Sequence, residues 1–200
     1  MDERKSPEIY EGEFIEAYCE NIKREGADKL LGWLKSTDFF TAPASYRFHS
    51  SFEGGLAHHS MNVYRRLKKN VQSEFGAGYA SFISDESIAV CGLLHDVCKA
   101  EYYKTEMRNV KENGVWVQRP YYAVEEKLPY GHGEKSVYII NGFMRLTREE
   151  ALAINWHMGG FDARVKGGGS VTAVYEKSVL SVLMHVSDIE ATYIDEERGR

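Results

Sequence analysis

The sequence predicts a mostly α-helical protein, a single helical bundle with a small β-hairpin inserted around residues 102–125. Apolar side chains recur at helical spacing in several segments, which is the pattern of helices that bury one face. One segment instead mixes Tyr, Val, Lys and Glu around an Asn-Gly pair, which is typical of hairpins. The length of 200 residues suits one domain built around one core.

Two short helices are expected in the first forty residues. Residues 13–24 carry an apolar stripe that includes Phe14 and Ile22, and Gly26 then interrupts the pattern. Residues 28–35 form a second, strongly apolar segment. The two segments therefore predict a pair of helices joined by a short turn.

A long helix is predicted over residues 56–75. Val63, Leu67 and Val71 repeat at a spacing of four residues, and most of the basic residues fall on other faces. The glycine-rich stretch at residues 76–78 ends this helix, because glycine disfavours the helical state.

The next helix is expected to begin at Ser84. A serine hydroxyl can cap a helix start, and the acidic residues that follow it suit the positive end of the helix dipole. The helix then passes through the apolar run of residues 88–94 and ends in the pair His95-Asp96.

Residues 101–128 differ in character from the rest of the chain. The pair Asn113-Gly114 lies between two runs of β-forming residues, and this arrangement is a strong hairpin signal. We expect a two-stranded ribbon that follows Lys99 closely and helps to shape a pocket.

Helices are expected to resume after the hairpin. The pattern predicts one over residues 133–144, another after a capping box that starts at Thr147, and a last one over residues 171–193. The glycine loop at 167–169 is interpreted as a flexible connection or lid, and the tail at 195–200 as solvated or frayed.

The pair His95-Asp96 carries the most chemical information in the sequence. It closes an apolar run, where a charge and an imidazole are costly unless something binds them. A metal ion is the usual reason for such a placement, because it binds carboxylates and neutral imidazoles. We therefore predict a metal site at the end of this helix.

Five separate segments supply candidate ligands for that site. A carboxylate and histidine set without cysteine favours Mn, Fe, Mg, Co, Ni or Zn as one or two bound divalent ions. Six ligands exceed the needs of one catalytic metal with open positions, whereas two ions that share Asp96 as a bridge account for the number. The candidates are His59, His95, Asp96, His132, His157 and Asp188.

Composition excludes several classes of protein. The net charge of −5 argues against a surface that coats nucleic acid, and no apolar run approaches the roughly 20 residues that span a bilayer. The charged start of the chain lacks the apolar core of a signal peptide, and the three cysteines form no paired motif. We expect a cytoplasmic protein with reduced thiols and no membrane partner; the oligomeric state stays open.

Three segments of this sequence resemble the motifs of the HD-domain superfamily of metal-dependent phosphohydrolases. Gly54-Gly55-Leu56-Ala57-His58-His59 resembles the first histidine motif, Leu93-Leu94-His95-Asp96-Val97-Cys98-Lys99 the His-Asp motif, and His185-Val186-Ser187-Asp188 the last aspartate motif. The resemblance implies one HD-type domain over residues 1–200, with its motif-bearing core at about 43–190.

The same resemblance implies roles for individual residues. The ligands of the first metal would be His59, His95, Asp96 and Asp188, and the extra histidines of the two-metal branch match His132 and His157. Asp96 and Lys99 are the expected catalytic residues, with Lys99 placed to contact a phosphate oxygen. No ligand role is assigned to His49, His58 or His185.

The likeness is greatest to small predicted HD hydrolases and to the HD domain of a 3′-5′ exoribonuclease group. The nucleic-acid-binding barrel that accompanies that exonuclease domain is missing, so nucleic acid is not the favoured substrate. The expected activity is hydrolysis of a phosphate ester, such as a nucleotide or a related small compound, by a metal-activated water. Two alternatives stay open: a di-iron oxygenase on the same fold, and a non-catalytic nucleotide-binding regulatory module.

Overall fold

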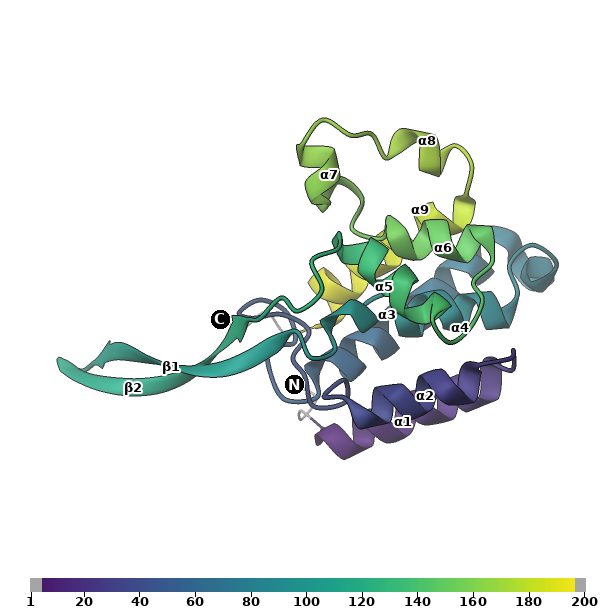
Figure 1. Ribbon diagram of the computed structural model, residues 1–200. Helices are drawn as coiled ribbons and strands as arrows, with labels where there is room; N and C mark the ends of the chain where they lie inside the picture. The colour runs from purple at the N-terminus through teal and green to yellow at the C-terminus, as the bar shows by residue number, and fades with distance from the viewer. Residues whose placement is uncertain (1–4, 197–200) are drawn as a thin grey trace.

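The computed structural model describes residues 5–196 and consists of a helical bundle from which one β-ribbon projects (Figure 1). The fold is mostly α-helical with a small two-stranded antiparallel sheet, as the sequence predicts. None of the helices in the described part of the chain is long and apolar enough to cross a membrane. The main helices are α1 (Pro7–Asn21), α2 (Ala27–Ser36), α3 (Gly55–Phe75), α4 (Asp85–Leu94), α5 (His132–Asn141), α6 (Arg148–Asn155) and α9 (Val179–Glu190).

Helix α3 is the centre of the bundle and packs against α1, α4 and α9. The side chains of Val63, Leu67 and Val71 are fully buried, which confirms the helical stripe predicted for this segment. Helix α4 crosses α3 closely at Gly92, where an added Cβ would lie 2.5 Å from the Cα of Tyr64. The glycine therefore allows the two helices that carry His59 and His95 to approach each other.

Helix α4 begins and ends where the sequence predicts. The Ser84 hydroxyl accepts a hydrogen bond from the backbone N–H of Ser87 at 3.1 Å, which caps the helix start. Every residue from Ile88 to Leu94 is buried, and His95 follows the last helical residue. The chain then leaves the helix through a 3₁₀ turn at Val97–Lys99.

The hairpin is confirmed with its predicted turn. Strands β1 (Tyr103–Glu112) and β2 (Val115–Val124) pair in antiparallel register, with Glu112 opposite Val115. Asn113 and Gly114 both have positive φ angles, of 49° and 86°, which a two-residue hairpin turn requires. The ribbon is continuous over ten residue pairs.

The last predicted helix is wrong in its extent. The segment 171–193 is divided into α8 (Thr172–Tyr175) and α9, because Ser178 adopts an extended backbone and caps α9 through the N–H of Ser181. After α9 the chain continues as one turn of π-helix over Ala191–Asp195. The sequence also gave no signal for the short α7 (Ala163–Lys166).

Two boundaries near the ends of the chain also differ from the prediction. Helix α1 starts at Pro7 rather than Glu13, since proline is favoured in the first helical turn. The tail is not solvated throughout, because Glu196 is only 6% exposed. The predicted fraying of residues 197–200 lies outside the described residues.

Candidate metal centre

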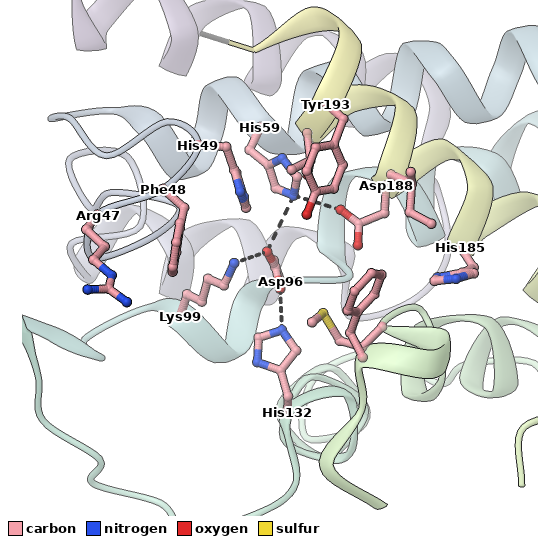
Figure 2. Close-up of a pocket in the computed structure, with 14 residues that line it drawn as sticks. Arg47, Phe48, His49, His59, Asp96, Lys99, His132, His185, Asp188 and Tyr193 are labelled. Atoms are coloured by element: carbon pink, nitrogen blue, oxygen red, sulfur yellow. Dashed lines mark hydrogen bonds and ion pairs between the residues drawn. The ribbon is translucent and has the colours of Figure 1, made fainter. Parts of the chain in front are cut away.

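The six predicted ligands converge on one place in the bundle. They reach it from α3, from the end of α4, from the start of α5, from the turn after α6, and from α9. Figure 2 shows His59, Asp96, His132 and Asp188 directed toward a shared interior. Residues separated by up to 129 positions along the chain thus form a single cluster; the members are His59, His95, Asp96, His132, His157 and Asp188.

Asp96 lies at the centre of this cluster, and its two carboxylate oxygens face different histidines. Its Oδ2 lies 3.6 Å from Nε2 of His59 and 3.5 Å from Nε2 of His95. Its Oδ1 lies 2.8 Å from Nε2 of His132 and 3.6 Å from Nε2 of His157. Each oxygen therefore serves one pair of imidazoles, which is the arrangement that a bridging carboxylate between two ions requires.

Asp188 completes the side of the cluster that holds His59 and His95. Its Oδ1 lies 3.2 Å from Nε2 of His59. One ligand atom from each of these three residues lies within 4.8 Å of the other two. The first group thus offers two imidazole nitrogens and one carboxylate oxygen to a common point, in addition to Oδ2 of Asp96.

Backbone carbonyls fix the orientation of two of the imidazoles. Nδ1 of His95 lies 3.0 Å from the carbonyl oxygen of Gly92, and Nδ1 of His157 lies 2.6 Å from that of Ile154. A carbonyl oxygen can only accept, so Nδ1 carries the proton in both rings. In the neutral form of each ring the remaining Nε2 atom is a bare lone pair directed into the cluster, as a metal ligand must be.

Two observations test whether this donor set fits a metal ion. Nε2 of His157 is buried and has no hydrogen-bond partner among residues 5–196, although an unpaired buried polar atom is costly. Nε2 of His59 and Nε2 of His95 lie only 3.2 Å apart. Ligand nitrogens about 2.1 Å from one cation come within roughly 3 Å of each other, so an ion shared by His59 and His95 would explain the second observation, and an ion at His157 the first.

Glu196 is the site residue that the sequence analysis missed, in a segment predicted to be solvated. Its Oε1 lies 2.7 Å from Nδ1 of His59, and its Oε2 accepts a hydrogen bond of 2.8 Å from the Ser50 hydroxyl. A carboxylate behind a ligating histidine orients the ring and makes it a better donor. No local pattern signals this role, because 137 residues separate Glu196 from its partner.

The charges around the cluster favour a bound cation. Burial opposes charge on Asp96, but Lys99 and the surrounding histidines outweigh it and hold the pKa of this carboxyl well below its usual range. His59 likewise lowers the pKa of Asp188. Burial opposes a proton on His59, yet the carboxylates of Glu196 and Asp188 raise the pKa of His59 to about 10. Carboxylates that stabilise an imidazolium here would stabilise a metal ion equally well.

Lys99 reaches the cluster although α4 ends at Leu94, five residues before it. The 3₁₀ turn brings its Nζ to 2.6 Å from Oδ2 of Asp96. Burial disfavours its charge, but Asp96 outweighs that effect and raises the pKa of Lys99 above its ordinary value. The lysine is therefore a fixed cation on the wall of the pocket.

His132 contacts a cysteine in addition to Asp96. The Cys98 sulfur lies 3.5 Å from Nδ1 of His132, and both residues share a third group of potential ligands with Asp96. The sequence analysis assigned Cys98 to packing. Its thiol is buried, and burial raises the pKa of Cys98 to about 12, so this sulfur is a neutral neighbour of the imidazole.

The three histidines without a predicted ligand role have different surroundings. His58 faces away from the cluster, with Nδ1 3.1 Å from the Ser50 hydroxyl. His185 lines the pocket, and its Nδ1 donates to the carbonyl oxygen of His157 at 2.6 Å. His49 lines the pocket beside His59, with ring centroids 4.8 Å apart.

The cluster lies at the bottom of a cavity of about 680 Å³. Arg47 and Phe48 flank it on one side, and Figure 2 shows Tyr193 above it. Met158 and Phe161, from the segment after α6, also line the cavity. The sequence predicts a flexible connection or lid only farther along the chain, at residues 167–169. A cavity of this size accepts a small organic ligand, with an apolar wall for its body and a polar floor for its reacting group.

Comparison with known proteins does not assign this chain to a family. No protein-family model matches the chain, and no curated protein and no solved structure matches it. The resemblance to the HD-domain superfamily therefore stays a prediction from the sequence motifs. The case for a metal centre depends on the positions of the side chains themselves.

Proposed function

We propose that this chain is a metal-dependent phosphoric ester hydrolase of the HD type. The observation that carries the proposal is that the two carboxylate oxygens of Asp96 face different pairs of histidines. Oδ2 faces His59 and His95, and Oδ1 faces His132 and His157. Such an arrangement suits two divalent ions bridged by one carboxylate. Paired divalent ions are typical of enzymes that displace an oxygen at phosphorus.

The protein's residues would divide the ligand positions between them. His59, His95 and Asp188 would hold one ion with Oδ2 of Asp96, and His132 and His157 would hold the other with Oδ1. When bound, divalent ions in such a site lower the pKa of water to supply a nucleophile and offset charge on the ester. The native metal would be one of Mn, Fe, Mg, Co, Ni and Zn, which accept carboxylate and imidazole ligands.

The remaining residues would bind and orient the substrate. Lys99 lies at the wall of the cavity with its ammonium group fixed by Asp96, and there it would contact a phosphoryl oxygen as charge develops. Arg47 at the side of the cavity would meet a second anionic group. Phe48, Phe161 and Tyr193 would pack against a ring, so a nucleotide or a related small phosphate ester is the proposed substrate class.

The test is phosphate release by the purified full chain. Separate samples loaded with Mn, Mg, Co or Ni are assayed against phosphomonoesters, nucleotides and cyclic dinucleotides, with the Asp96→Asn variant beside the wild type. We expect metal-dependent turnover that falls at least about 100-fold in Asp96→Asn, since metals supply several kcal/mol of transition-state stabilisation. Asp28→Asn on the exposed side of α2 is the control and should retain full activity.

Two outcomes would contradict the proposal. Hydrolysis that persists undiminished in Asp96→Asn would show that the cluster does not carry the reaction. Oxygen consumption by iron-loaded protein, with no phosphate released from any ester, would assign the cluster to oxygenase chemistry instead.

A further inference from the structure

The β-ribbon formed by β1 and β2 is the part of the molecule that the metal centre does not explain. It is inserted between Lys99 and His132 and projects from the bundle as a free arm (Figure 1). Within residues 5–196, the hydrogen bonds and ion pairs of side chains 105–121 join two residues of the ribbon itself. A two-stranded ribbon is marginally stable in water when nothing packs against it.

The two faces of the ribbon differ in how their side chains are satisfied. On one face, Arg119 pairs with Glu112 at 2.7 Å, the Tyr121 hydroxyl donates to Glu106 at 2.7 Å, and Arg108 lies over the Tyr121 ring. The charges on this face are thus largely neutralised within the ribbon. We call it the Arg108 face.

The opposite face, which we call the Met107 face, is apolar or uncharged with one exception. Because directly paired residues of an antiparallel ribbon share a face, the register defines its members. Lys111 is its one charged residue, and Met107 and Trp116 are 56% and 68% exposed. The members are Tyr103, Thr105, Met107, Asn109, Lys111, Trp116, Gln118, Pro120, Tyr122 and Val124.

An exposed aromatic patch continues the Met107 face at the root of the ribbon. The Tyr103 hydroxyl donates to the carbonyl oxygen of Ala44 at 3.5 Å, which places the loop after Ala44 beside this face. In that loop Tyr46 and Phe48 are 41% and 55% exposed, and Arg47 lies over both rings. Apolar surface therefore extends from the root of the ribbon to Trp116 near its tip.

We propose that the Met107 face is a dimer interface, covered by the same face of a second copy of this chain. Two ribbons related by a two-fold axis and running in opposite directions would place the tip of each at the root of the other. Trp116 of one copy would then pack on Tyr46 at the root of its partner's ribbon. Strand addition at the edge of β2 is disfavoured, because Pro120 cannot donate a backbone hydrogen bond there.

The charges argue against a nucleic acid as the occupant of the Met107 face. The whole chain has a net charge of −5, and the four basic residues of the strands are accompanied by two acidic ones. Nucleic acid would need free cations along the exposed face, and that face offers only Lys111.

The area sets the expected strength of the contact. Ten residue pairs span about 33 Å, and a face roughly 10 Å wide gives on the order of 700 Å² for two copies. With the root patches the total approaches about 1,000 Å², which is the lower limit for a specific interface. We therefore expect a reversible dimer with a dissociation constant in the micromolar range.

Sedimentation velocity of the full chain over about 1 to 200 µM tests the proposal. We expect the wild type to pass from monomer to dimer across this range, and Trp116→Ser or Met107→Ser to weaken the dimer at least about tenfold. Val115→Ser is the matched control, because Val115 is 63% exposed beside Trp116 but lies on the Arg108 face. It should leave the dimer unchanged, and circular dichroism should be the same for all four proteins.

Three results would overturn the proposal. The wild type could remain a monomer at the highest concentration, or form species larger than a dimer, which a closed two-fold contact forbids. Val115→Ser could weaken the dimer as much as Met107→Ser does. A labelled single-stranded oligonucleotide could bind the wild-type monomer but not Trp116→Ser, which would identify the ribbon as a nucleic-acid-binding element instead.

Discussion

The metal cluster and the β-ribbon depart from the usual burial of apolar groups in opposite ways. The cluster buries polar groups, with His59, His95 and Asp96 at most 2% exposed. The ribbon exposes apolar groups, with Trp116 at 68% and Met107 at 56%. Each departure costs free energy in the isolated chain, and each would be relieved by a partner of the matching chemistry, a metal ion for the cluster and an apolar surface for the ribbon.

The difference lies in how each region is supported. Ligands of the cluster come from five segments and are oriented by groups behind them, such as Glu196 and the carbonyl of Gly92. The ribbon is stabilised by its own strand pairing and cross-strand contacts. We therefore expect the cluster to be sensitive to single substitutions at distant positions, and the ribbon to tolerate them.

Metal content should show the largest effect. We expect Asp96→Ala to lose both ions, since the carboxylate is shared, and His157→Ala to retain one. Inductively coupled plasma mass spectrometry on protein purified under identical conditions measures the ions per chain. His58→Gln serves as the control, because His58 lies next to a ligand but faces away from the cluster. If Asp96→Ala and the wild type contained equal numbers of ions per chain, Asp96 would not bridge two metal ions.

A buried ion pair away from the cluster should affect stability without affecting metal binding. Arg24 donates two hydrogen bonds, of 2.7 and 2.8 Å, to the fully buried Glu150. We expect Glu150→Gln to lower the free energy of unfolding by about 2 kcal/mol, because Arg24 loses its buried carboxylate partner and keeps only Glu86. Urea denaturation at neutral pH measures the change. Glu149→Gln on the same helix is the control, and metal content should stay constant in both variants.

The same pair predicts the direction of a pH dependence. Burial opposes the charge of Glu150, but Arg24, the N–H of Thr147 and the Ser87 hydroxyl outweigh it and lower the pKa of this carboxyl. The stabilisation is therefore present above the unfolded pKa of about 4.3 and is lost as the pH falls through the lower folded value. Glu150→Gln should flatten this part of the stability curve, and an unchanged acid limb would contradict the assignment.

Glu196 tests whether support from behind a ligand matters. We expect Glu196→Gln to weaken metal binding about 10- to 100-fold, because a neutral amide does not make the His59 imidazole a better electron-pair donor as the carboxylate does. Titration with a competing chelator measures the affinity. Glu190→Gln is the matched control, since Glu190 contacts Asn70 and Arg66 rather than a ligand. Equal affinities in the two variants would reduce Glu196 to a structural role.

The ribbon should give the smallest effect on the monomer. We expect Trp116→Ser to change the free energy of unfolding by less than about 0.5 kcal/mol and to leave metal content unaltered, because the indole is exposed. Thermal denaturation at a low protein concentration, where the dimer is dissociated, measures the monomer alone. A large drop in melting temperature would mean that the ribbon packs on its own bundle.

Several elements could be predicted from local sequence because local physics decides them. The turn at Asn113-Gly114 requires two positive φ angles that these residues tolerate, and the Ser84 cap satisfies backbone groups within its own first turn. The side chains that converge were predictable as candidates as well, because a histidine and a carboxylate at the end of an apolar run are costly there unless something binds them. The break at Ser178 was not predictable, because apolar periodicity continues across it.

The sequence alone determined which residues could bind a metal and which segments form helices, because side-chain chemistry and periodicity are properties of neighbouring residues. Only the tertiary structure decided that Glu196 supports His59 and that Nε2 of His157 is left without a hydrogen-bond partner among the described residues. These relations depend on how helices far apart along the chain pack together. Packing geometry is set by the whole core, and no single segment encodes it.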